Sequence, residues 1–322
     1  MGKLLEIKNL HLYFNFYQLV LKALNGVDLV INEREILGLV GETGSGKSIT
    51  ALSTLQLIPS SGSIVKGTII FQGENLLDKT ENQMKDLRGN LISMIFQNPR
   101  ESLNPVFDVG KQLVTVYLSH RQASKREAYD KVMEMMQAVG IADARAQINA
   151  YPHQLSGGIC QRIMIAAALI CSPKLLIADE PTTALDVTVQ AEVLDLILDL
   201  VRTRDASCLF ITHDLGVVAE ICDRVAVMYA GHVVETGPVG EIFNNPLHPY
   251  TQGLIKSTLR VDQYQPISVV PGNIPDASTL PTGCPFHPRC HHAKEICEEI
   301  YPKAIIPDAN HSVTCHKISE GW

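Results

Sequence analysis

The hydrophobic positions of the first hundred residues predict a series of strands. Residues 4–14 alternate apolar and polar side chains, which is typical of a strand with one buried face. Residues 23–31 predict a further strand pair, and residues 35–40 form a short apolar run that ends at Gly41. Such a run, bounded by glycine, indicates a strand buried on both faces. Further strands are expected near residues 67–72 and 92–96.

The pattern turns helical from about residue 99 to residue 171, which predicts a helical insertion. Within it, residues 124–139 predict a helix that Gly140 closes as a C-cap. Alternation then resumes with a strand at 174–178, a helix at 188–202, a strand at 208–212, a helix at 215–222 and two strands around 230–232. In the helix 188–202, Val189, Val193 and Ile197 recur at helical spacing. Strands that alternate with helices predict an α/β fold with a doubly wound sheet.

Composition and charge narrow the class of protein. The chain has 322 residues, is 46% apolar and carries a formal net charge of −7, which argues against a nucleic-acid binder. The longest apolar run, residues 163–171, is shorter than the roughly 18 residues that a spanning helix needs. The N-terminus also lacks the features of a signal peptide. We therefore expect a soluble protein that stays in the cytoplasm.

A glycine-rich loop lies between the strand 35–40 and a helix expected to run to about residue 57, and it fits the pattern G-x-x-x-x-G-K-S/T. Its glycines let backbone N–H groups approach a phosphate, and the helix N-terminus adds partial positive charge. Lys47 can neutralise the β- and γ-phosphates, and Ser48 can ligate Mg²⁺. The motif predicts a nucleoside triphosphate site, with contacts expected from Gly41, Gly44, Ser45, Gly46, Lys47, Ser48 and Ile49.

Polar side chains follow three of the expected strands. Asp179 and Glu180 end the strand 174–178, where unpaired buried charge would be costly without a cation. Asp179 is placed to hold Mg²⁺, and Glu180 to orient or deprotonate the water that attacks the γ-phosphorus. His213 follows the strand 208–212 and is expected to contact the γ-phosphate. Gln97 follows the strand 92–96 and can reach the metal or the water.

The eight cysteines are unevenly distributed, since Cys284, Cys290, Cys297 and Cys315 crowd into the last 39 residues. Disulfides are disfavoured in the cytosol. Structural zinc is chemically reasonable, but its ligands typically come as closer C-x₂₋₄-C pairs. An iron–sulfur cluster tolerates wider spacing and suits soft thiolate ligands. The other four cysteines are interpreted as small buried side chains.

The motifs together resemble the ABC transporter family over residues 4–257. The segment Leu155-Ser156-Gly157-Gly158-Ile159-Cys160-Gln161 is similar to the family's signature L-S-G-G-Q, and Ala184-Leu185-Asp186 is similar to its D-loop. The resemblance implies that Ser156, Gly157 and Gly158 cover the γ-phosphate held by a second cassette in a head-to-tail dimer, and that Asp186 reaches across the same junction. It also implies an aromatic residue that stacks on adenine, for which Phe14 is preferred over its neighbour Tyr13.

Three shorter segments resemble one branch of that family. The segments 95–105, 151–156 and 248–252 are similar to oligopeptide, dipeptide and nickel importer ATPases, closest to the D-type ATPase of dipeptide importers. The tail from Gly283 to His316 resembles the tail of peptide-importer ATPases, some of which carry a 4Fe–4S cluster. This favours a 4Fe–4S cluster on Cys284, Cys290, Cys297 and Cys315, with Zn²⁺ as the alternative.

The expected fold is therefore a P-loop ABC cassette, with a RecA-like core, an antiparallel β subdomain and a helical subdomain at about 99–171. It spans residues 1–257, and residues 258–322 are expected to form a small cysteine-rich module. The expected function is ATP hydrolysis that drives uptake of di- or oligopeptides. Alternatives are the same ATPase serving nickel or another solute, and a non-transport ABC ATPase.

The resemblance also implies the partners. These are a second ABC ATPase subunit (a related paralogue or an identical chain), two transmembrane permease subunits, and indirectly an extracytoplasmic solute-binding protein, with no nucleic acid. The protein would be peripheral on the inner face of the membrane.

Overall fold

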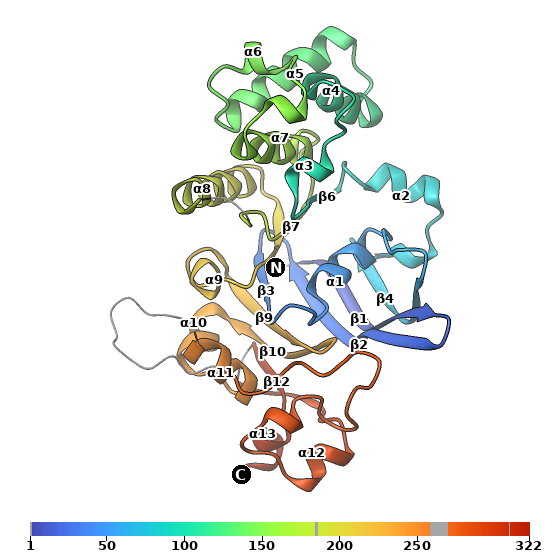
Figure 1. Ribbon diagram of the computed structural model, residues 1–322, viewed down its shortest axis with the longest axis vertical. Helices are drawn as coiled ribbons and strands as arrows, with labels where there is room; N and C mark the ends of the chain where they lie inside the picture. The colour runs from blue at the N-terminus through green and yellow to red at the C-terminus, as the bar shows by residue number, and fades with distance from the viewer. Residues whose placement is uncertain (1, 184–185, 258–269, 309) are drawn as a thin grey trace. The chain divides into compact units, whose positions relative to one another are not determined.

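The computed structural model describes residues 2–183, 186–257, 270–308 and 310–322 (Figure 1). The chain forms two compact units. Unit 1 contains Met1–Asp78 together with Phe210–Trp322, and unit 2 contains the intervening Lys79–Leu209. Unit 1 is therefore discontinuous in sequence, whereas unit 2 is one continuous segment. The strand β8 (Ser207–Ile211) carries the chain from unit 2 back into unit 1.

An antiparallel sheet in unit 1 has the strand order β2-β1-β4-β5. The alternation predicted for residues 4–14 is confirmed, because Leu5, Ile7, Leu10 and Leu12 are buried, with an irregularity between Ile7 and Leu10 that shifts the alternation by one residue. The predicted pair at 23–31 is instead one long strand that pairs with the first. The elements are β1 (Lys3–Phe16), β2 (Leu19–Asn32), β4 (Gly62–Phe71), β5 (Glu74–Asn75) and the 3₁₀ turn Leu76–Asp78.

A second set of strands in unit 1 has the order β11-β12-β10-β9-β3. All five residues of β3 are buried, as the apolar run predicted, and β3 is parallel to β9. The strands are β3 (Ile36–Val40), β9 (Arg224–Tyr229), β10 (His232–Pro238), β11 (Ala304–Asp308) and β12 (His311–Thr314). The helices are α1 (Lys47–Thr54), α9 (Leu215–Ile221), α10 (Val239–Asn244), α11 (Pro249–Ser257), the 3₁₀ turn His287–Arg289, α12 (Glu295–Glu299) and α13 (His316–Glu320).

The described part of the tail is built into unit 1. Strand β12 pairs with β10 through Glu235 opposite Val313 and Thr236 opposite Ser312, and the Lys22 N–H donates to the Ala277 carbonyl at 2.9 Å. The expectation of a separate cysteine-rich module is therefore not supported. We expected a separate module because this sequence is rich in Pro and Cys, and the hairpin β11–β12 was therefore not predicted. The expected boundary at 257/258 touches residues 258–269, which lie outside the described residues, and it stays a prediction.

Unit 2 combines a parallel strand pair with the helical stretch that the sequence predicted. Strand β6 (Ile92–Ile95) pairs with β7 (Leu175–Asp179). Helix α5 (Lys125–Ala138) begins at a capping box of Ser124 and Glu127, and Gly140 follows it at φ 75°. The other helices are α2 (Glu81–Leu87), α3 (Pro99–Ser102), α4 (Val109–His120), α6 (Ala144–Gln147), the 3₁₀ turn Pro152–Gln154, α7 (Gly157–Leu169) and α8 (Val187–Thr203).

Helix α7 is the centre of unit 2. It is apolar around most of its circumference and contacts α3, α4, α5, α8 and β6. In the described parts of the chain, no helix combines the length and apolar character that crossing a membrane requires.

Candidate functional site

The phosphate-binding motif forms a tight loop between β3 and α1. Gly41 has φ 152°, and a Cβ atom at this position would lie 2.1 Å from the Met228 carbonyl oxygen. Gly46 is the N-cap of α1 at φ 107°, a left-handed conformation that favours glycine. Only glycine therefore fits at these two positions. The loop delivers Lys47 as the first residue of the helix, as the sequence predicted.

Two side chains of the loop, Ser45 and Lys47, are buried. Lys47 is 6% exposed, and its Nζ donates to the Gly41 carbonyl at 2.8 Å and to the Glu42 carbonyl at 3.0 Å. Ser45 is fully buried, and its Oγ has no hydrogen-bond partner among the described residues. Buried polar groups normally find a partner, so an orphaned hydroxyl here fits a loop that receives polar ligand atoms. Ser48 is exposed and Ile49 is half-buried, both in the first turn of α1.

His213 shares a cavity with the start of the phosphate loop. The Thr212 N–H donates to the Leu39 carbonyl at 3.4 Å, which places the end of β8 beside the end of β3. A cavity of about 360 Å³ is lined by Gly41 and Glu42 on the loop and by His213 after β8. The structure therefore brings together these parts of unit 1, which the sequence placed at two different strand ends.

The carboxylate pair of unit 2 lies at the end of β7. Asp179 is 6% exposed and is the last residue of the strand. Glu180 has φ 46°, an uncommon conformation for a residue other than glycine. Its Oε2 accepts hydrogen bonds from Gln97 Nε2 at 2.9 Å and from Thr183 Oγ1 at 3.0 Å. Gln97 thus lies next to the expected base.

The signature segment begins helix α7. Ser156 is the N-cap, exposed, and its Oγ accepts from the Ile159 N–H at 3.3 Å. Gly157 and Gly158 form the first turn. Gln161, which follows the unusual Ile159-Cys160 pair, is 1% exposed and donates to the Pro181 carbonyl. This bond joins the signature helix to the loop that carries Glu180.

Asp186 and Phe14, two expected residues of the nucleotide site, lie at the start of a helix and on the face of a strand, respectively. Asp186 is exposed and caps α8 by accepting from the Val189 N–H at 3.0 Å. Its D-loop neighbours 184–185 lie outside the described residues. Phe14 is half-buried on β1 and lies against Gly62, opposite it on β4. Tyr13 points to the other face of the strand, where it lines a separate cavity with His11.

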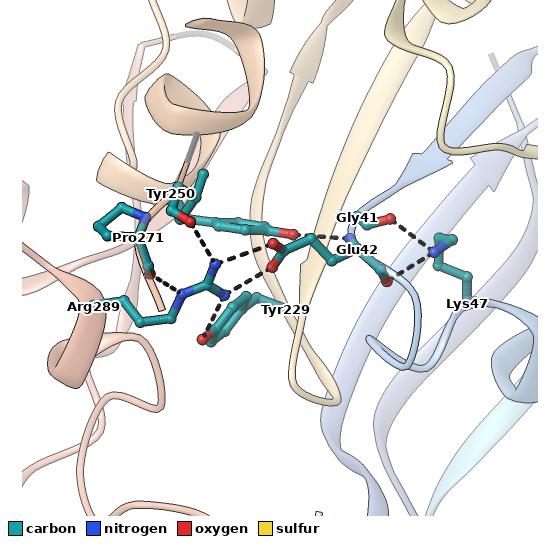
Figure 2. A network of polar contacts seen from close by, with 8 residues as sticks. Gly41, Glu42, Lys47, Tyr229, Tyr250, Pro271 and Arg289 are labelled. Atoms are coloured by element: carbon teal, nitrogen blue, oxygen red, sulfur yellow. Dashed lines mark hydrogen bonds and ion pairs between the residues drawn. The ribbon is translucent and has the colours of Figure 1, made fainter. Parts of the chain in front are cut away.

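A polar network that the sequence analysis did not predict joins the loop to the tail (Figure 2). Arg289 Nη1 and Nη2 donate to the two carboxylate oxygens of Glu42 at 2.8 and 3.1 Å. The Glu42 N–H donates to the hydroxyl of Tyr250 at 2.9 Å. Burial lowers the pKa of the Arg289 guanidinium, but its hydrogen bonds to Glu42 and Tyr229 outweigh this effect and raise the pKa above its ordinary value.

The four tail cysteines line one cavity together with His248, Phe286 and His316. All eight cysteines of the chain are free thiols. Burial raises the pKa of the Cys284 thiol to about 12, a backbone hydrogen bond from Phe286 opposes the rise, and the neighbouring cysteines add to it. The four cysteines that the sequence grouped therefore lie around one cavity.

The expected metal site itself finds no support. Within the described residues, no group of three or more His, Cys, Asp or Glu residues is arranged so that it could hold a metal ion. Cys297 lies on the short helix α12, Cys315 is the N-cap of α13, and Cys290 caps the 3₁₀ turn His287–Arg289.

Comparisons with known proteins identify the family. The chain matches the ABC transporter family over residues 24–183 and the C-terminal region of oligopeptide/dipeptide transporters over residues 234–297. It is 47% identical over 322 residues to the oligopeptide transport ATP-binding protein AppD of Bacillus subtilis, covering 99% of this chain and 98% of that protein. It is 47% identical over 300 residues to OppD, an oligopeptide transport ATP-binding protein of Salmonella typhimurium, covering 93% and 89%.

A solved structure shows the same cassette fold. The dimeric, post-hydrolysis ATP-binding cassette MJ0796 bound to ADP and Pi is 25% identical, with a TM-score of 0.66 over 73% of this chain and 98% of that one. The predicted α/β P-loop cassette is confirmed. The chain therefore belongs to the ABC transporter family, as an ATP-binding subunit of its oligopeptide and dipeptide importer branch.

Proposed function

We propose that Lys47 and the backbone of the phosphate loop hold ATP, and that Glu180 activates the water that cleaves it. The chain is an ATP-hydrolysing subunit of a peptide importer. Two separate observations, one in each unit, support the assignment of residues. In the glycine loop, Ser45 Oγ has no hydrogen-bond partner among the described residues, and Lys47 Nζ donates to a carbonyl of the loop itself. At the end of β7, the Glu180 carboxylate accepts a hydrogen bond from Gln97.

The chemistry follows from these side chains. The oxygen of the attacking water bonds to the γ-phosphorus while the bond to the bridging oxygen breaks and ADP leaves with that electron pair. Glu180 accepts the proton of the water, and the hydrogen bonds from Gln97 and Thr183 fix the direction of its carboxylate. His213, in the cavity beside Gly41, donates a hydrogen bond to the γ-phosphate.

A magnesium ion fits the oxygen groups present. The exposed hydroxyl of Ser48 and the buried carboxylate of Asp179 are oxygen ligands of the type that Mg²⁺ takes, with the Gln97 amide as a further ligand. Bound there with ATP, Mg²⁺ would neutralise charge on the phosphates.

We further propose that hydrolysis takes place in a dimer of cassettes. Ser156, Gly157 and Gly158 begin a long helix whose N-terminus is suited to a phosphate, and Ser156 is exposed. The related cassette MJ0796 is described as dimeric with ADP and Pi. The second cassette is a related paralogue or an identical chain, and Asp186 reaches across the junction. Phe14 stacks on adenine.

The dimer would act on the cytoplasmic face of the cell membrane. Two separate transmembrane permease subunits carry the solute, delivered by an extracytoplasmic solute-binding protein. The named relatives are oligopeptide transport proteins, so a di- or oligopeptide is the proposed solute. Coupling would pass through the segment after Gln97, where α3 is exposed.

Variants of Lys47 and Glu180 test the assignment of residues. Lys47→Ala should abolish ATP binding in calorimetric titration, because it removes the cation that faces the phosphates. Glu180→Gln should bind ATP normally but lose about 10²–10³-fold in turnover, since an amide cannot accept the proton. Glu134→Gln, on the exposed face of α5, is the matched control and should keep wild-type turnover. Unchanged turnover in Glu180→Gln would overturn the assignment of the base.

We also propose a 4Fe–4S cluster on Cys284, Cys290, Cys297 and Cys315. The donor set fits, because four soft thiols line one cavity. Each thiolate of such a cluster binds a different iron atom, so the thiols need not converge on one point as zinc ligands must. The cluster would supply a structural staple for a tail with little apolar core of its own.

Anaerobic purification tests the cluster. The protein should be brown, with iron and sulfide in equal amounts, and Cys284→Ser should lose the colour. Cys171→Ala, in unit 2, should keep it. A colourless protein that contains one zinc ion per chain would reverse the assignment.

A further inference from the structure

Glu42 occupies a position of the phosphate-binding motif at which any residue is allowed, yet its carbonyl, its N–H and its carboxylate all have partners (Figure 2). Its carbonyl accepts from Lys47, its N–H donates to Tyr250, and its carboxylate binds Arg289. Tyr250 and Arg289 lie 208 and 247 residues later in the chain. A local motif at the N-terminal end is therefore fixed by the C-terminal end of unit 1.

Arg289 is built into its place. Its side chain is 5% exposed, and Nε donates to the Pro271 carbonyl at 2.7 Å while Nη2 donates to the Val270 carbonyl at 3.3 Å. Nη1 also donates to the Tyr229 hydroxyl at 3.3 Å. The planar guanidinium group of Arg289 thus donates to two backbone carbonyls as well as to the Glu42 carboxylate. Lysine could not reproduce this geometry.

An aromatic cluster separates the ion pair from the cysteine cavity. The ring centroids of Tyr229 and Phe286 lie 5.2 Å apart, and those of Tyr250 and Phe286 lie 5.5 Å apart. Phe286 is buried and lines the cavity of the four cysteines. Arg289 belongs to the same short segment, between Cys284 and Cys290. The segment that forms the cysteine cavity therefore also supplies the cation for the loop.

We propose that Arg289 is a positioning residue for the phosphate loop, acting through Glu42. Two physical effects contribute. Arg289 fixes the peptide of Glu42, whose carbonyl orients Lys47, and it neutralises a carboxylate that would otherwise repel the incoming phosphates. The inference rests on the proposed role of this loop in binding ATP, and it adds a residue of the tail to that site.

Nucleotide affinity of the full chain, titrated with Mg-ADP in a calorimeter, tests the inference through a double-mutant cycle. Arg289→Met should weaken binding about tenfold, which is ~1.4 kcal/mol. Glu42→Gln alone should change affinity by less than about threefold. The double variant of Arg289→Met and Glu42→Gln should bind Mg-ADP better than Arg289→Met alone, because it no longer carries an unpaired Glu42 carboxylate. Arg289→Lys should lie between wild type and Arg289→Met, since it keeps the charge without the fork.

The control is Arg224→Met, which breaks another ion pair of unit 1, between Arg224 and Glu35 at 2.9 Å. It should lower the melting temperature but leave Mg-ADP affinity unchanged. Wild-type affinity in Arg289→Met would overturn the inference. So would an equal loss in Arg224→Met, or a double variant no better than Arg289→Met. If Lys47→Ala still binds Mg-ADP, the assignment of the loop has failed instead.

Discussion

Glu42 and Glu180 are both acids next to nucleotide-binding motifs, but their surroundings give them different roles. Glu42 meets the guanidinium of a buried arginine, so its charge is neutralised. The Glu180 carboxylate accepts hydrogen bonds from an amide and a hydroxyl, which orient it. An acid paired with a cation can stand beside phosphates, and a carboxylate held in a fixed direction can accept a proton.

His232 gives a residue-level prediction about pH. Burial, together with a smaller effect of the nearby His11, lowers its pKa to about 4. The unfolded chain has a histidine pKa of about 6.5, so between these values the unfolded state binds a proton that the folded state excludes. The free energy of unfolding should therefore fall as the pH drops from 6.5 toward 4, by about 2 kcal/mol at pH 5.

The variant His232→Phe isolates this contribution, because it keeps the stack on Tyr301, whose ring centroid is 4.5 Å away. Urea unfolding at pH 7 and pH 5 should show the variant gaining about 2 kcal/mol on the wild type between the two. His248, whose pKa burial lowers to about 3, is present in both proteins and cancels. Parallel behaviour of the two proteins would contradict the prediction.

At the scale of elements, the N-caps of α5 and α7 both stabilise their helices, but only the N-cap of α7 is proposed to contact nucleotide. Ser124 caps α5 and Ser156 caps α7, each by accepting from a backbone N–H. Replacing either with alanine should cost about 1 kcal/mol in urea unfolding. Only Ser156→Ala should also reduce ATP turnover, because only its hydroxyl is proposed to meet a phosphate. Equal turnover in both variants would remove Ser156 from the site.

The elements that could be predicted from the sequence are those with local causes. The strand β3, the phosphate loop and the caps at Ser124 and Gly140 depend on neighbouring residues alone. The hairpin β11–β12 was missed because its strands are short, β12 pairs with β10 far away in sequence, and β11 contains Pro307. The Arg289–Glu42 ion pair was missed for the same reason, since nothing near either residue indicates the other.

At the scale of the molecule, three segments of the chain meet at Glu235. The Glu235 carboxylate is 1% exposed and accepts from the Leu247 and His248 N–H groups and from His311 Nε2. It therefore joins β10, the start of α11 and the C-terminal hairpin of unit 1.

His311→Leu should lower the free energy of unfolding by about 2–3 kcal/mol, because it removes a hydrogen bond to a buried charged group. Hydrogen exchange should accelerate first in residues 304–314. His292→Leu, which changes an exposed histidine, serves as the control and should leave both measurements unchanged. Wild-type exchange of residues 304–314 in His311→Leu would show that Glu235 does not hold the hairpin.

The split sequence of unit 1 has a consequence for synthesis on the ribosome. Unit 2 is continuous, so it can fold as soon as it has emerged. Strand β3 emerges early, whereas its partner β9, and Arg289 further along the chain, are translated only after unit 2. The apolar strand must therefore remain shielded from aggregation while unit 2 is being synthesised, and a nascent chain can hold its phosphate loop fully in place only after Arg289 has emerged.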